Sequence, residues 1–346
     1  MLSLTDEQVS LAEAVRAWAS GRDFLAAARE HPGAPTSVRE SAASAAELGL
    51  LGILSPDGGG TYADLAVVVS ELGRAGADAP VAEIAAALAA FSGDLDVAGV
   101  EAGSTLLVPA IANPEQAGVE AKPDSSGGLV LTGRLASVAG AGAADWLLVA
   151  AGSEAGPALA LVPASAAGLT VTRRETLDIT REFSAVELDG VVASSWTPDD
   201  GLLFDVLAVQ AVVDAVGAAG ALLEKTVGYV KEREQFGQVV GAFQAVKHHA
   251  ATMATEWEAA YSVARAAALA LDGHDATVRA HAVSVAAAYA KPACSRIAGT
   301  AIQLHGGMGF TWEHDVHVLV RRVKTDELVL GAPRWHRERL VRLLGA

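Results

Sequence analysis

The spacing of apolar residues changes twice along this chain, and this is the feature that most constrains its fold. Long stretches with helical spacing of apolar residues fill the first hundred residues and return after about residue 200. Between them lie short apolar runs separated by Gly, Pro, Asn and Asp, such as Trp146–Ala150 and Leu159–Val162, a pattern typical of antiparallel strands. The order predicts an α+β protein, mostly helical, with a helical domain at 1–102, a β-domain at 103–195 and a helical bundle at 196–346.

The two helical regions differ in kind. Thr5 and Gln8 have the spacing of a capping box, so we expect the first helix to begin there. The later helices carry apolar residues on several sides, which is typical of a bundle that also packs against other subunits. We expect these helices at 201–232, 242–272, 275–304, 313–329 and 334–344.

Charge and composition exclude several classes of protein. The chain has 25 Lys and Arg against 41 Asp and Glu, a net charge of −16, so binding to nucleic acid or to an anionic membrane is not expected. No basic segment precedes an apolar run at the start, and Asp205, Gln210 and Asp214 interrupt the most apolar stretch, so we predict neither a secretion signal nor a membrane span. Cys294 is the single cysteine, which excludes an internal disulfide and a thiolate metal site. We expect a soluble cytoplasmic protein.

Two clusters that contain glycine each follow a predicted helix. The first runs from Arg233 to Gly237 and continues with Phe243 and Gln244, and the second runs from Gln303 to Phe310. Taken separately, such glycines are typical of helix C-caps, and an arginine at a helix end typically interacts with the helix dipole. Their occurrence together, in a chain of this α–β–α order, is much more specific.

With these two motifs the chain resembles the acyl-CoA dehydrogenase family over nearly its whole length. The family motifs are Arg-x-x-Phe-Gly followed by Phe-Gln, and Gln-x-x-Gly-Gly-x-Gly-Phe/Tyr. The resemblance implies an N-terminal helical domain, a middle β-domain and a C-terminal four-helix bundle, with FAD held at a subunit interface. The residues that it implies for FAD binding are Arg233, Phe236, Gln244, Gln303, Gly306 and Gly307.

The chemistry of these residues suits a dinucleotide. A guanidinium presents a planar fork that matches a pyrophosphate, which makes Arg233 a candidate for the FAD diphosphate. Gly306 and Gly307 have no Cβ, so a dinucleotide can approach their backbone closely. In the family, these groups reach mainly into the flavin site of the neighbouring subunit.

The catalytic base of the family is missing at both of its usual positions. The family reaction is α,β-dehydrogenation of an acyl-CoA thioester, in which a glutamate removes the α-proton. The two positions are occupied by Leu330 and Leu207, neither of which can accept a proton. Asp205 is the alternative candidate for the base. A shift of two residues along a helix rotates the direction of the side chain by about 200°, so Asp205 would point away from a substrate that lies at position 207. Asp326 and Glu327 are interpreted as solvated charges at a helix end.

Other functional positions are also changed. Phe204 and Asp205 match a Phe-Asp pair that lines the acyl-CoA pocket of the family, but the arginine expected three residues later is Ala208. The loop that contacts flavin and substrate has no clear counterpart around 108–118. The family segment that touches the isoalloxazine, Lys-x-Trp-Ile-Thr, contains an aromatic residue and a threonine. It corresponds to 135–139 in this chain, where both are absent. No histidine spacing predicts a metal site, and His314 and His317 share a helical face without further ligands.

Three hypotheses follow for function. The favoured one is a base-lacking subunit of a heteromeric FAD-dependent dehydrogenase, similar to the α₂β₂ enzymes of bacterial steroid side-chain β-oxidation, with a homologous chain as partner. The second is a self-sufficient homo-oligomeric acyl-CoA dehydrogenase with an unusual base, acting in fatty acid or steroid degradation. The family implies an electron-transferring flavoprotein as the acceptor for both. The third is a DNA-binding relative of the family, which the net charge of −16 disfavours.

Overall fold

The computed structural model describes residues 3–33, 36–125, 127–273 and 275–345. Its first part is helical, and α1 begins with the predicted capping box, in which Thr5 and Gln8 each cap the backbone N–H of the other. The helices of this part are α1 (Asp6–Ser20), α2 (Phe24–Glu30), α3 (Thr36–Ala46), α4 (Tyr62–Ala75), α5 (Val81–Ala90) and α6 (Val97–Glu101).

A twisted β-sheet follows, with its strands in the order β6-β7-β3-β2-β4-β5-β8 and with β1 paired to β4. Their bounds are β1 (Leu107–Ala110), β2 (Val119–Pro123), β3 (Leu129–Ala139), β4 (Trp146–Ser153), β5 (Gly156–Pro163), β6 (Leu169–Arg174), β7 (Phe183–Val192) and β8 (Ser195–Pro198). Most strand pairs are antiparallel, as the apolar runs predicted, but β1 and the start of β2 run parallel to β4. Apolar runs of this length look the same in either direction of pairing.

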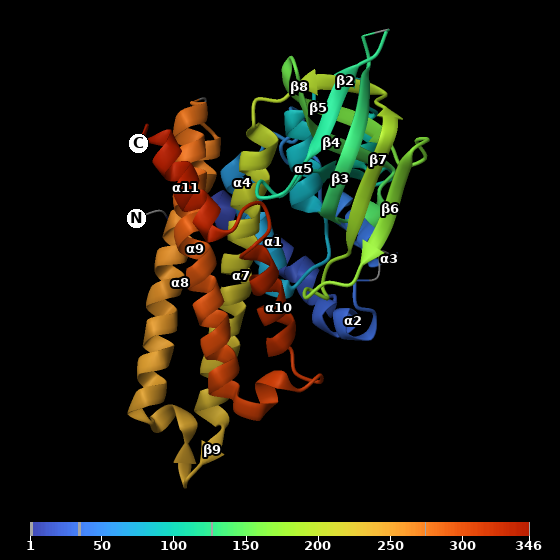
Figure 1. The fold of residues 1–346 in the computed structure, drawn as a ribbon. Helices are drawn as coiled ribbons and strands as arrows, with labels where there is room; N and C mark the ends of the chain where they lie inside the picture. The colour runs from blue at the N-terminus through green and yellow to red at the C-terminus, as the bar shows by residue number, and fades with distance from the viewer. Residues whose placement is uncertain (1–2, 34–35, 126, 274, 346) are drawn as a thin grey trace.

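The last part contains α7 (Leu202–Glu232), α8 (Gln244–Leu271), α9 (Ala276–His305), α10 (Val316–Asp326) and α11 (Pro333–Leu343). These helices lie within three residues of the predicted bounds at each end. The short hairpin of β9 (Glu234–Gln235) and β10 (Gln238–Val239) joins α7 to α8 at one end of the bundle. Figure 1 shows α7, α8 and α9 side by side, with the sheet on the other side of the molecule and α4 and α5 between them.

Helix α7 is the central element of the molecule. By length and composition it is apolar enough to cross a membrane, but 89% of its most apolar window is buried inside the fold. Asp205, Gln210 and Asp214 interrupt the apolar run within the continuous helix that was predicted over 201–232, and the two aspartates are paired with arginines. Buried ion pairs thus let an apolar helix carry charged residues without a break.

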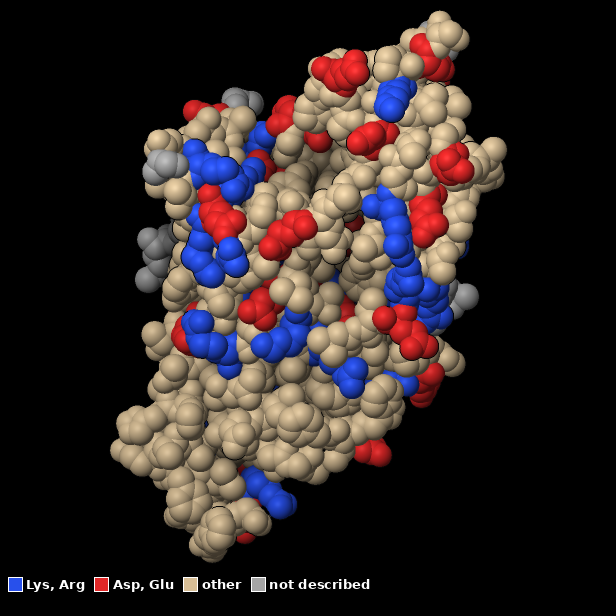
Figure 2. Space-filling view, in the orientation of Figure 1, with Lys and Arg blue, Asp and Glu red and all other residues tan. Residues whose placement is uncertain are grey.

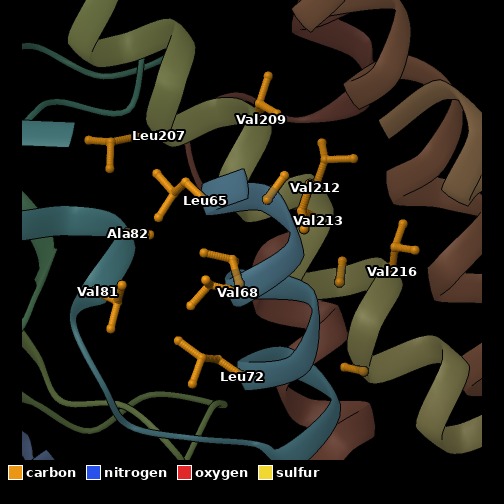
Figure 3. Close-up of a cluster of buried hydrophobic side chains, with 14 of the residues drawn as sticks. Leu65, Val68, Leu72, Val81, Ala82, Leu207, Val209, Val212, Val213 and Val216 are labelled. Carbon is orange, nitrogen blue, oxygen red and sulfur yellow. The ribbon is translucent and has the colours of Figure 1, made fainter. Parts of the chain in front are cut away.

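The core is formed where α4 and α5 pack against α7. Figure 3 shows Leu65, Val68 and Leu72 of α4 pointing toward Val81 and Ala82 of α5, with Leu207 of α7 near Leu65. Glycine allows α4 and α7 to approach closely, because a Cβ on Gly217 would lie only 2.1 Å from the carbonyl oxygen of Ser70. The close contact of α4 with α7 places both helices beside the cavity described below.

We predict that Gly217→Ala destabilises the chain, whereas Gly228→Ala, on the same helix, stabilises it. Replacing glycine by alanine inside a helix normally stabilises by about 0.5–1 kcal/mol, and a Cβ on the exposed Gly228 meets no atom within 4 Å. At Gly217 the same Cβ forces α4 and α7 apart, at a cost of about 1–3 kcal/mol. Urea unfolding of both variants measures the difference, and equal effects of the two substitutions would contradict the close contact.

Candidate functional site

A cavity of about 360 Å³ lies between the helical parts and the sheet. Its wall includes Leu72 of α4, Glu83 of α5, Pro109 of β1 and Ser137 of β3. The rest of the wall is formed by helices α7 and α10, by the segments next to β7 and by the segment that follows α10. A cavity of this size is sufficient for a small organic ligand.

Both positions of the missing base line this cavity. Leu207 of α7 and Leu330, which follows α10, are separated by more than a hundred residues but meet at the same space. Ser137, Val138 and Ala139, which replace the flavin-contacting segment of the family, also line it. The cavity therefore lies where the resemblance places the reaction, and it has leucine at both base positions.

The expectation that Asp326 is a solvated helix-end charge is wrong. Its side chain is fully buried and lines the cavity, and Arg181 donates to its Oδ1 at 2.6 Å. Arg181 also donates to Asp178 at 2.7 Å. Burial raises the pKa of Asp326 well above its ordinary value, against the opposing effect of Arg181. Glu327 is half-buried and accepts a hydrogen bond from Ser295.

A second buried ion pair lies beside the first. Arg322 of α10 donates from Nε and Nη2 to the two carboxylate oxygens of Asp214, at 2.7 and 2.6 Å, and from Nη1 to Thr180 at 2.7 Å. Burial by itself would raise the pKa of Asp214, but Arg322 outweighs this effect and the pKa is lowered to about 2. Asp214 therefore stays ionised, and its charge is satisfied by Arg322.

Phe204 and Asp205 do not line the cavity. Asp205 is buried and accepts from Arg279 at 3.0 Å and from Arg339 at 2.8 Å, so both of its oxygens are engaged. The Phe204 ring packs against Trp335, with ring centroids 5.6 Å apart. This placement does not support contact of either residue with substrate, nor Asp205 as a base, and both assignments stay predictions.

The residues implied for FAD lie at the hairpin end of the bundle, outside the cavity. Arg233 ends α7 and is exposed, as is Gln244 at the start of α8. Phe236 is 92% exposed in the hairpin, where its φ of 53° is unusual for a residue other than glycine. Gln303, Gly306 and Gly307 are exposed at the end of α9.

These exposed residues fit a dinucleotide that is completed by another chain. Among the described residues, the Arg233 side chain makes no ion pair, and a Cβ on Gly306 or Gly307 would meet no atom within 4 Å. Apolar side chains are exposed beside them, since Phe310 is 73% accessible. Figure 2 shows few charged side chains on this end of the molecule, whereas both signs are scattered over the rest of the visible face. An exposed apolar surface of this kind is typical of an interface.

Sequence reasoning missed a buried clamp around Leu330. The Lys291 ammonium of α9 donates to the carbonyl oxygens of Val329 and Gly331 at 2.6 and 2.9 Å, and His336 lies 3.0 Å from that of Leu330. Leu330 itself has a φ of 56°, a costly conformation for a branched side chain. Burial lowers the pKa of Lys291 to about 8. A lysine within the apolar run of 276–304 was the available signal.

The histidines that the structure describes do not gather into a metal site. His305 and His314 are in ring contact, and His317 stacks on Trp312. The part of the chain that the structure describes contains no group of three or more His, Cys, Asp or Glu residues placed to hold a metal ion.

Comparisons with known proteins agree with this fold. The family model described as "Acyl-CoA dehydrogenase, C-terminal domain" matches residues 203–344. The acyl-CoA dehydrogenase FadE34 of Mycobacterium tuberculosis is 31% identical over 355 residues, a match that covers 97% of this chain and 48% of FadE34. The acyl-CoA dehydrogenase IpdE2 of the same organism is 30% identical over 281 residues, with 80% of this chain and 76% of IpdE2 covered.

A solved structure, of a Tcur3481-Tcur3483 steroid ACAD variant, superimposes with a TM-score of 0.88 at 27% identity and covers 98% of both chains. The fold is therefore shared with that structure: an N-terminal helical part, a β-sheet and a C-terminal helical bundle. The chain belongs to the acyl-CoA dehydrogenase family. The chain spans about half the length of FadE34.

We predict that His336 makes the chain sensitive to acid. Burial, with the nearby Lys291 charge, lowers the pKa of His336 from 6.5 to about 3. Between these values the unfolded chain binds a proton that the folded chain does not, so the free energy of unfolding falls as the pH falls, by up to about 1.4 kcal/mol per pH unit. In His336→Gln, which can still donate to the Leu330 carbonyl, this contribution disappears.

Urea unfolding of wild type and His336→Gln at pH 7, 6, 5 and 4 measures the difference. We expect the variant to have the shallower pH dependence, whereas His281→Gln, at an exposed position of α9, should follow the wild type. If wild type and His336→Gln give parallel curves, the buried neutral histidine is refuted.

Proposed function

We propose that this chain is the base-lacking subunit of a heteromeric, FAD-dependent acyl-CoA dehydrogenase. The reaction is α,β-dehydrogenation of an acyl-CoA thioester in fatty acid or steroid side-chain β-oxidation, with 1–102, 103–195 and 196–346 acting as three domains. The observation that carries the proposal is that Leu207 and Leu330 line one cavity while the FAD motif residues remain exposed elsewhere. The chain thus keeps groups that serve a neighbour and lacks the base at both family positions.

The comparisons support an assembly of two unlike units. The Tcur3481-Tcur3483 steroid ACAD is named for two components, and the match covers 98% of both chains. FadE34 is about twice as long as this chain, since 97% of this chain corresponds to 48% of it, so it has room for a second unit of the same size. We propose a homologous chain with a glutamate base as the partner, in an α₂β₂ heterotetramer in the cytoplasm.

FAD would be held by this chain's residues at the hairpin end. Arg233 would bind its diphosphate, Phe236 would cover a ring, and Gln244 and Gln303 would offer amide groups. Gly306 and Gly307 would let the dinucleotide approach the backbone. When bound, FAD supplies the acceptor for the hydride that leaves the β-carbon, and an electron-transferring flavoprotein is the proposed acceptor that follows it.

One observation favours the second candidate, a self-sufficient dehydrogenase. Glu83 of α5 lines the cavity, and burial raises the pKa of its carboxyl. A carboxylate with a raised pKa is a suitable general base when it reaches the α-proton. In a homo-oligomer of this chain, Glu83 would therefore take the role that the family gives to a glutamate at position 207 or 330.

Expression with and without the partner separates the two candidates. We expect the lone chain to be poor in flavin and inactive, and the co-expressed complex to be yellow and to reduce an artificial acceptor when given an acyl-CoA. In the complex, Arg233→Ala should lower the flavin content per chain, whereas Arg134→Ala, on the exposed face of β3, should leave it unchanged.

The measurements are flavin absorbance per chain and turnover. One FAD per lone chain together with normal turnover would refute the base-lacking role. A loss of that turnover in Glu83→Gln would then establish the self-sufficient enzyme.

A further inference from the structure

The cavity combines an apolar wall with a buried polar end. Its wall includes Val69, Leu72, Ile111 and Val138. The polar end is formed by one face of α7, where Gln210 and Asp214 are four residues apart, and by Arg322 and Asp326, which have the same spacing on α10. A ligand that fills this space would meet hydrocarbon along most of its length and polar groups at one end.

Gln210 is the residue that points most directly to a ligand. It is 2% exposed and lines the cavity, yet neither its Oε1 nor its Nε2 has a hydrogen-bond partner among the described residues. The buried carboxyl group of Asp326, in the same cavity wall, is already engaged by Arg181 and by the carboxyl group of Asp214. A buried amide without a partner is costly, and its position at the cavity indicates that a bound molecule satisfies it.

The charges at this end indicate that the molecule is neutral. Arg322 is engaged by Asp214, and Arg181 is engaged by Asp178 and Asp326. Each guanidinium therefore already has a carboxylate partner, which leaves little to attract an anion. Burial raises the pKa of Asp326, whose side chain is hydrogen-bonded to that of Asp214, so both acidic groups are engaged within the protein.

We propose that this cavity binds a neutral, mainly apolar molecule with a ketone or hydroxyl group, which Gln210 recognises, and that the molecule is held without being dehydrogenated. The Gln210 amide donates to a ketone oxygen, or both donates to and accepts from a hydroxyl. Binding is independent of the missing base, because no bond of the ligand changes. The proposal therefore goes beyond the dehydrogenase function and can fail or succeed separately from it.

The test is equilibrium dialysis of the full chain, and of its complex with the partner, against tritiated androst-4-ene-3,17-dione. This rigid ketone loses little conformational entropy on binding. Its matched probes are androstane, which has no polar group, and a steroid carboxylate of similar size. We expect the ketone to bind at least tenfold more tightly than either one.

Two variants separate polar recognition from simple burial. Gln210→Leu should weaken ketone binding roughly tenfold, the loss of about one hydrogen bond, and leave androstane binding unchanged. It should also raise the melting temperature of the free chain, because it removes a buried amide without a partner. Ala211→Leu, which narrows the cavity beside it, should weaken both ketone and androstane.

Three outcomes would overturn the proposal. The first is equal binding of ketone and androstane by the wild type, which would mean burial without recognition. The second is a Gln210→Leu variant with unchanged ketone binding and unchanged melting temperature, which would mean that ordered water satisfies the amide. The third is loss of ketone binding in proportion to added FAD, which would assign the cavity to the flavin.

Discussion

The bidentate ion pair between Arg322 and Asp214 is the interaction on which the arrangement around the cavity depends. It joins α10 to α7 in the interior and, through Thr180, reaches the segment before β7. Arg181 and Asp326 form a second bridge between the same segment and α10. Removing one partner of a buried pair leaves an uncompensated charge, which typically costs about 3–5 kcal/mol. The helices that enclose the cavity are thus held together by its polar end.

Much of this arrangement could be predicted from sequence, and the exceptions have physical reasons. The long helices were predictable because their apolar residues recur over twenty or more positions, and the capping box of Thr5 and Gln8 was predictable because it is local. Asp326 was misinterpreted because its partner Arg181 lies 145 residues away. Lys291 was missed because its partners are backbone carbonyls, which carry no sequence signal. Parallel pairing of β1 with β4 was missed for a similar reason, since an apolar run does not encode its neighbour.

The family resemblance and the geometry together divide the molecule into two ends. At the hairpin end, exposed motif residues and apolar side chains suit a partner and its flavin. At the cavity, Leu207 and Leu330 replace the base, while Lys291 and His336 hold the backbone around Leu330. Three backbone carbonyls in sequence are thus engaged by buried side chains, and this fixes Leu330 in the cavity wall.

The central claim is that no proton acceptor of this chain reaches the α-carbon of a bound thioester. The most direct measurement is exchange of the α-proton, with the lone chain incubated with butyryl-CoA or a steroid side-chain acyl-CoA in deuterium oxide and the thioester analysed by mass spectrometry. The account predicts no incorporation of deuterium above the rate without protein, and incorporation once the partner chain is added. Rapid exchange by the lone chain would contradict it.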